Sequence, residues 1–109
     1  MFKLDPCPEF TADVQITRPG EDKPGTLRLR FRHKTRKQFK AWMASAAGRE
    51  DPDYLLDVLV GWEGVADADG KPIEFSREAL EQLLDAFPAA GQEIFVAYGR
   101  QLHESRTGN

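Results

Sequence analysis

The chain has 109 residues, 40% of them hydrophobic and 30% charged, and a formal net charge of −3. This length fits one domain with a modest core, and the composition excludes a disordered chain. The single cysteine, Cys7, excludes an internal disulfide and the paired cysteines of a zinc site, which favours a reducing compartment. The N-terminus is not signal-like and no apolar run has membrane-spanning length, so we expect a cytosolic protein without membrane contact.

The charges are distributed unevenly along the chain. Seven basic residues and no acidic residue lie between Arg28 and Lys40, whereas acidic residues dominate the rest of the sequence. Such polarisation can steer association with a protein partner, with a second copy of the chain or with a nucleic acid.

Two segments near the N-terminus alternate apolar and polar residues, as strands with one buried face do. The first runs from Phe10 to Ile16 and the second from Leu27 to His33, and the intervening segment, RPGEDKPG, is rich in turn residues. We therefore expect a β-hairpin. The second strand carries three arginines on its polar face: Arg28, Arg30 and Arg32.

Helical spacing replaces the alternation after the hairpin. Thr35 is a suitable N-cap for a first helix that ends at Gly48. Asp51, as N-cap, and Pro52 then signal a second, shorter helix that ends near Gly61. The apolar faces are expected to hold Phe39, Trp42, Met43, Ala46 and Ala47 in the first helix, and Leu55, Val58, Leu59 and Trp62 in the second.

A turn and two further helices are predicted in the C-terminal half. The segment VADADGKPIEF, residues 65–75, places an Asp-Gly pair between apolar stretches, which indicates a tight turn or miniature hairpin. Ser76 caps a third helix that Pro88 ends, and a final helix follows.

The predicted fold class is α+β, with an N-terminal antiparallel β-hairpin packed on about four short helices. No internal repeat or linker is visible, so residues 1–109 are expected to form one domain. We expect residues 1–9 and 104–109 to be flexible.

No recognisable set of residues supports catalysis or metal binding. His33 and His103 lie beside no nucleophile motif. The cluster of Asp67, Asp69 and Gly70 is similar to part of a calcium loop, but no EF-hand register supplies both the anchoring carboxylates and the glycine. We expect no catalytic residues, no cofactor, no metal site and no enzymatic activity.

The basic segment 28–40 allows two interpretations. Its cations suit phosphate contacts, but no exposed aromatic ring is interleaved with them, because Phe31 points with the leucines toward the expected core. A face that is solvated or that docks protein is therefore favoured and nucleic-acid binding is not expected, although a small nucleic-acid-binding regulator stays the alternative. The unpaired edges of the hairpin also allow the chain to form a homo-oligomer.

Several motifs occur in a fixed order over residues 10–103. A basic strand, TLRLRFRHKTRK, leads to a helix with a central Trp, and the segments DPDYLLDVLVGWEGV, DADGKPIEFS and IFVAYGRQL follow. In this order the motifs resemble the tail assembly chaperones of siphophages, a family of bacteriophage and prophage proteins.

This resemblance implies a function in virion morphogenesis without catalysis. The protein would bind the tape measure protein, keep it soluble and help recruit the major tail protein in the host bacterial cytoplasm, and it would be absent from the mature virion. A structural minor tail protein is a further alternative. The candidate partner-binding residues are Arg28, Arg30, Arg32, Tyr54 and Trp62.

Overall fold

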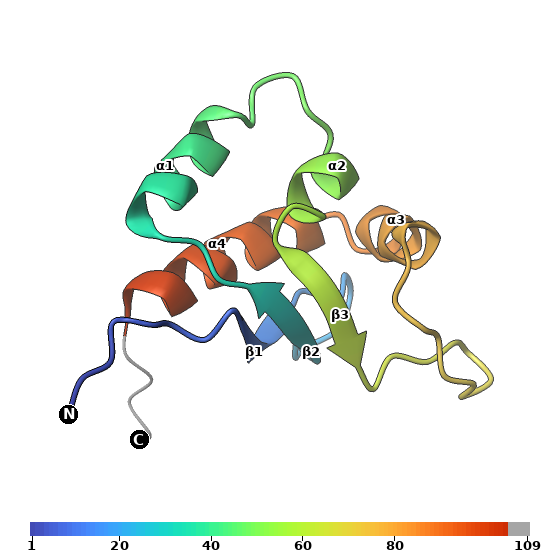
Figure 1. The fold of residues 1–109 in the computed structure, drawn as a ribbon. Helices are drawn as coiled ribbons and strands as arrows, with labels where there is room; N and C mark the ends of the chain where they lie inside the picture. The colour runs from blue at the N-terminus through green and yellow to red at the C-terminus, as the bar shows by residue number, and fades with distance from the viewer. Residues whose placement is uncertain (105–109) are drawn as a thin grey trace.

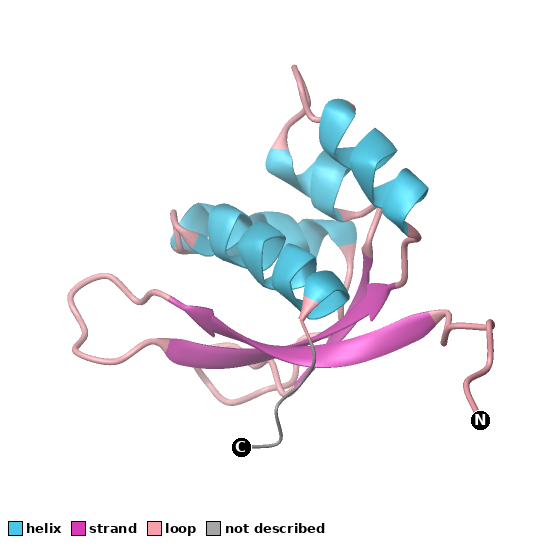
Figure 2. Cartoon of the chain, turned by 90° about the vertical axis from the view of Figure 1, so that its left-hand side faces the viewer, coloured by secondary structure: helices cyan, strands magenta, loops and turns pink. Residues whose placement is uncertain are grey.

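The computed structural model describes residues 1–104, which form a three-stranded antiparallel sheet with the helices on one of its faces (Figures 1 and 2). Most of the segment 104–109, expected to be flexible, lies outside the described residues. The predicted α+β class is confirmed. The elements are β1 (Glu9–Ile16), β2 (Gly25–Arg32), α1 (Arg36–Ala44), α2 (Asp51–Leu55), β3 (Leu59–Glu63), α3 (Arg77–Ala86) and α4 (Ala90–His103).

The predicted hairpin is formed by β1 and β2. Phe10 lies opposite Phe31, and Ala12 lies opposite Leu29, in an antiparallel register without a shift. Residues opposite each other share a face of the sheet, so the apolar residues of both strands meet under the helices. The three arginines of β2 are exposed on the other face.

The second predicted helix is wrong beyond Leu55. Residues Leu59–Glu63 form β3, which pairs with the free edge of β2. Glu50 is the N-cap, in place of Asp51. The helical spacing of this segment was misleading because pairing places Trp62 opposite Leu29 and Glu63 opposite Arg28, so a strand packs the same apolar residues and matches opposite charges.

The first helix is shorter than predicted. Thr35 caps it as expected, in a capping box in which Gln38 bonds back to the backbone of Thr35. The last helical residue is Ala44, and the hydroxyl of Ser45 donates to the carbonyl of Trp42 at 2.6 Å. Met43, which was expected on the buried face, lies within the helix but is 41% exposed.

Tyr98 on α4 lies at the centre of the core. Its side chain is 0% exposed, and its ring contacts those of Phe10, Phe31 and Phe39 at centroid distances of 5.1 to 6.1 Å. The hydroxyl donates to the carbonyl of Arg32 at 2.7 Å. Burial raises the pKa of Tyr98 well above its ordinary value, so the hydroxyl keeps the proton that it donates.

A second aromatic contact joins the short helices to this centre. Trp42 stacks on Tyr54, with 4.2 Å between the ring centroids, and the indole nitrogen donates to the carbonyl of Tyr54 at 3.2 Å. Trp42 also meets Tyr98 edge-on at 5.3 Å. The expectation that Trp42 belongs to the core is confirmed.

The first and last elements of the described chain pack against each other. The backbone N–H of Thr17, just after β1, donates to the Glu93 carboxylate of α4 at 2.9 Å. Phe10 of β1 stacks on Tyr98 of α4, with 6.0 Å between the ring centroids. The sheet is therefore covered by the last helix of the described residues, which is made after all three strands.

Two tyrosine substitutions should separate the role of a paired hydroxyl from that of an unpaired one. Tyr98→Phe leaves the Arg32 carbonyl without its donor and should lower the free energy of unfolding by about 1–2 kcal/mol. The Tyr54 hydroxyl is buried without a hydrogen-bond partner among the described residues, so Tyr54→Phe should be neutral or slightly stabilising. Urea denaturation measures both; equal losses would contradict the assignment.

Candidate protein-docking face

The face of the sheet opposite the helices is polar and open. We call it the outer sheet face, and alternation along each strand places its side chains there. It is made of Glu9, Thr11, Asp13 and Gln15 of β1, Thr26, Arg28, Arg30 and Arg32 of β2, and Glu63 of β3.

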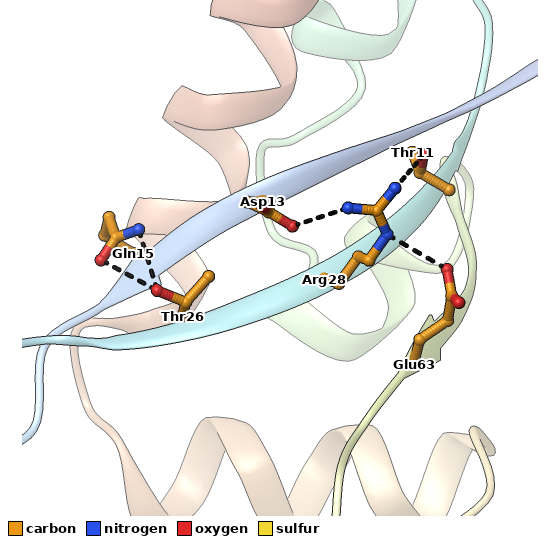
Figure 3. Close-up of polar contacts among 6 residues, drawn as sticks. All are labelled: Thr11, Asp13, Gln15, Thr26, Arg28 and Glu63. Atoms are coloured by element: carbon orange, nitrogen blue, oxygen red, sulfur yellow. Dashed lines mark hydrogen bonds and ion pairs between the residues drawn. The ribbon is translucent and has the colours of Figure 1, made fainter.

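Arg28 connects the three strands on this face (Figure 3). Its guanidinium donates to Asp13 of β1 and to Glu63 of β3, each at 3.3 Å, and to the hydroxyl of Thr11 at 3.4 Å. The side chains of Gln15 and Thr26 bond to each other further along the hairpin. Arg28 is therefore held in a fixed, partly neutralised position.

The other two arginines differ in their pairing. Arg30 forms an ion pair with Glu9 at 3.5 Å, and it covers Gly61 so closely that a Cβ there would lie 2.8 Å from the guanidinium. Arg32 has no ion pair with any residue in the range 1–104. Three arginines thus share the outer sheet face with three acids, and the face is close to neutral despite its basic central strand.

A groove of about 700 Å³ runs beside β3, and we call it the Trp62 groove. Arg30, Gly61 and Trp62 line one part of it. The indole nitrogen of Trp62 donates to the carbonyl of Ile73 at 2.9 Å, and Phe75 meets the indole edge-on with 5.1 Å between the ring centroids. The groove therefore combines half-buried apolar side chains with one cation, Arg30, and one acid, Glu74.

The segment after β3 forms the other wall and confirms the predicted turn. Ile73 donates to the carbonyl of Val65 at 2.8 Å, and an isolated bridge joins Ala66 to Pro72. The carboxylate of Asp67 accepts the backbone N–H groups of Asp69 and Lys71, each at 2.9 Å. Asp67 thus stabilises the turn, as an Asx turn does.

The five predicted partner-binding residues separate into three groups. Arg30 and Trp62 line one groove, and Arg28 and Arg32 lie on the adjoining outer sheet face. Tyr54 is only 7% exposed and stacks on Trp42, so little of its ring is accessible to a partner. Sequence reasoning missed Val65, Ile73 and Phe75 as groove residues, although the GWEGV and PIEFS motifs contain them.

The structure contains neither of two features that would indicate another kind of site. Within residues 1–104, no group of three or more His, Cys, Asp or Glu side chains is placed to hold a metal ion. Over the same range, no helix combines the length and apolar character needed to cross a membrane.

The structure is thus that of a small α+β protein with a polar outer sheet face and a partly apolar groove beside it. A family model described as phage tail assembly chaperone matches residues 1–109, so the chain belongs to the phage tail assembly chaperone family. Membership indicates a non-catalytic protein that acts in the host during assembly and interacts with tail proteins. No curated protein and no solved structure gives a significant match.

Arg28→Ala should leave the fold intact. Its ion pairs are solvent-exposed, with about half of the arginine side chain accessible, so their loss should lower the free energy of unfolding by less than about 1 kcal/mol. Because salt screens such pairs, the difference from the natural chain should shrink in 1 M NaCl. A larger, salt-independent loss in urea denaturation would mean that Arg28 also supports packing.

Proposed function

We propose that this chaperone binds the tape measure protein during tail assembly, keeps it soluble and helps recruit the major tail protein. The contact surface in this proposal is the outer sheet face together with the Trp62 groove. Membership in the tail assembly chaperone family supports the general role. The observation that carries the choice of surface is that Arg30 and Trp62 line the same groove beside the edge strand β3.

The chemistry of this surface suits reversible contact with an amphipathic partner. Trp62 and Phe75 offer apolar area without being fully exposed, which favours a specific contact over nonspecific hydrophobic association. Arg28 and Arg30, already fixed by acids of the same face, can orient polar groups of the partner with little further ordering. Many copies bound along a long tape measure would add their modest affinities through multivalency.

Co-expression with the cognate tape measure protein tests this assignment. Arg30→Ala and Trp62→Ala should each reduce the amount of tape measure protein that is soluble and co-purifies, by about five-fold for a loss of about 1 kcal/mol per contact. Lys71→Ala, an exposed cation outside the groove lining, is the matched control and should behave like the natural chain.

Circular dichroism of each purified variant must show the fold before the result is interpreted. A tape measure protein that is equally soluble without the chaperone, or that is captured equally by all variants, would refute the proposal. Adding the major tail protein to the purified complex then tests recruitment: it should join the complex formed by the natural chain and not the tape measure protein alone.

The chaperone should also be absent from finished particles. We propose that it leaves the tape measure protein as the tail tube forms, so mass spectrometry of purified virions should detect the tape measure and major tail proteins without this chain. A stoichiometric amount of the chain in virions would instead support the alternative of a structural minor tail protein.

A further inference from the structure

A second groove lies between the start of α1 and the end of α4. It has a volume of about 720 Å³ and shares no lining residue with the Trp62 groove. Three cations, Lys34, Arg36 and Lys40, and three apolar side chains, Phe39, Met43 and Leu102, are among its lining residues. We call it the α1/α4 groove.

The cations of this groove differ in their pairing from Arg28 and Arg30, two of the three arginines of the outer sheet face. Arg28 and Arg30 have acidic partners, whereas Lys34, Arg36 and Lys40 have none among residues 1–104. The first turn of α1 also contains no acidic residue. The fold thus places the paired arginines Arg28 and Arg30 on the outer sheet face, and around the groove it places three cations of the same basic run that are unpaired within residues 1–104.

The apolar residues of the groove form its floor, in which Phe39 is held rigidly and Met43 can change its conformation. Phe39 is only 8% exposed and is held by ring contacts with Tyr98 at 6.1 Å and with His103 at 5.0 Å. Met43 is 41% exposed, and its unbranched side chain can fit apolar groups of different shapes. Such an apolar floor can bind an apolar side chain of a partner, and the surrounding cations can bind its carboxylates.

A nucleic acid fits this arrangement less well than a peptide. Base stacking requires an accessible ring face, and Phe39 is almost fully covered. The exposed ring of the lining, His103, meets Phe39 edge-on and is held by a 2.7 Å hydrogen bond between its Nδ1 and the carbonyl of Gly99. The exposed Met43 adds apolar contact area that a nucleic acid does not use. Charge complementarity and apolar surface together therefore favour an acidic segment of protein.

We propose that the α1/α4 groove binds an acidic segment of another protein, with carboxylates facing Lys34, Arg36 and Lys40 and an apolar side chain against Met43. This inference goes beyond the proposed function, because it concerns a separate surface and a partner segment of defined chemistry. A chaperone with two such surfaces can hold two segments at once.

Fluorescence anisotropy with defined probes tests the proposal on the full chain. The main probe is a labelled 14-residue peptide of Glu and Leu at helical spacing. Two companion peptides replace Leu by Ser or Glu by Lys. A third companion probe is a 14-nucleotide single-stranded DNA. The Glu/Leu peptide should bind at least ten-fold more tightly than each companion, and Lys40→Glu should weaken its binding about ten-fold.

Two control variants test whether the peptide binds at the α1/α4 groove. Lys23→Glu makes the same charge change at an exposed position in the β1–β2 loop and should leave peptide affinity within two-fold of the natural chain. Met43→Ser should weaken the binding of the Glu/Leu peptide and leave the affinity for the Glu/Ser peptide unchanged. Circular dichroism confirms that each variant folds.

Three outcomes would overturn the proposal. Tighter binding of DNA than of the Glu/Leu peptide, lost in Lys40→Glu, would make the groove a nucleic-acid site. Self-association that Lys40→Glu abolishes, without peptide binding, would make the occupant a second copy of the chain. Peptide binding that Lys23→Glu weakens as much as Lys40→Glu does would show general attraction to the basic surface.

Discussion

The alternation along β2 is the constraint on which the rest of the structure depends. One set of its residues, Leu27, Leu29 and Phe31, builds the floor of the core, and the other set places three arginines on the outer sheet face. Because the period of a strand is two, a shift of one residue would exchange these sets. Both the packing under the helices and the candidate docking face therefore require the same register.

The flanking strands reinforce this register from both sides. Glu9 and Asp13 of β1 and Glu63 of β3 meet the arginines only when the three strands are aligned as observed. Each exposed ion pair contributes little free energy, but a slipped strand would lose the pairs together with the apolar contacts. The charges of the outer sheet face thus favour one register over its alternatives.

The hairpin, the caps at Thr35 and Ser76 and the turn before Phe75 could be predicted because their signals are local. β3 could not. Leu55, Val58, Leu59 and Trp62 have helical spacing, and the preference for a strand arises only from the free edge of β2, which is distant in sequence. The same long-range pairing places Gly61 opposite Arg30, so that Arg30 and Trp62 line one groove. Tyr54, a plausible contact residue in sequence, is covered by Trp42.

The packing of α4 on β1 determines when the domain can fold during synthesis. Tyr98 completes the aromatic centre, and its helix, α4, is the last element of the described residues. Until α4 leaves the ribosome, Phe10, Phe31 and Trp42 lack the ring that covers them. A nascent chain therefore carries open hydrophobic surface until α4 has been made, and the chaperone passes through an aggregation-prone stage of its own.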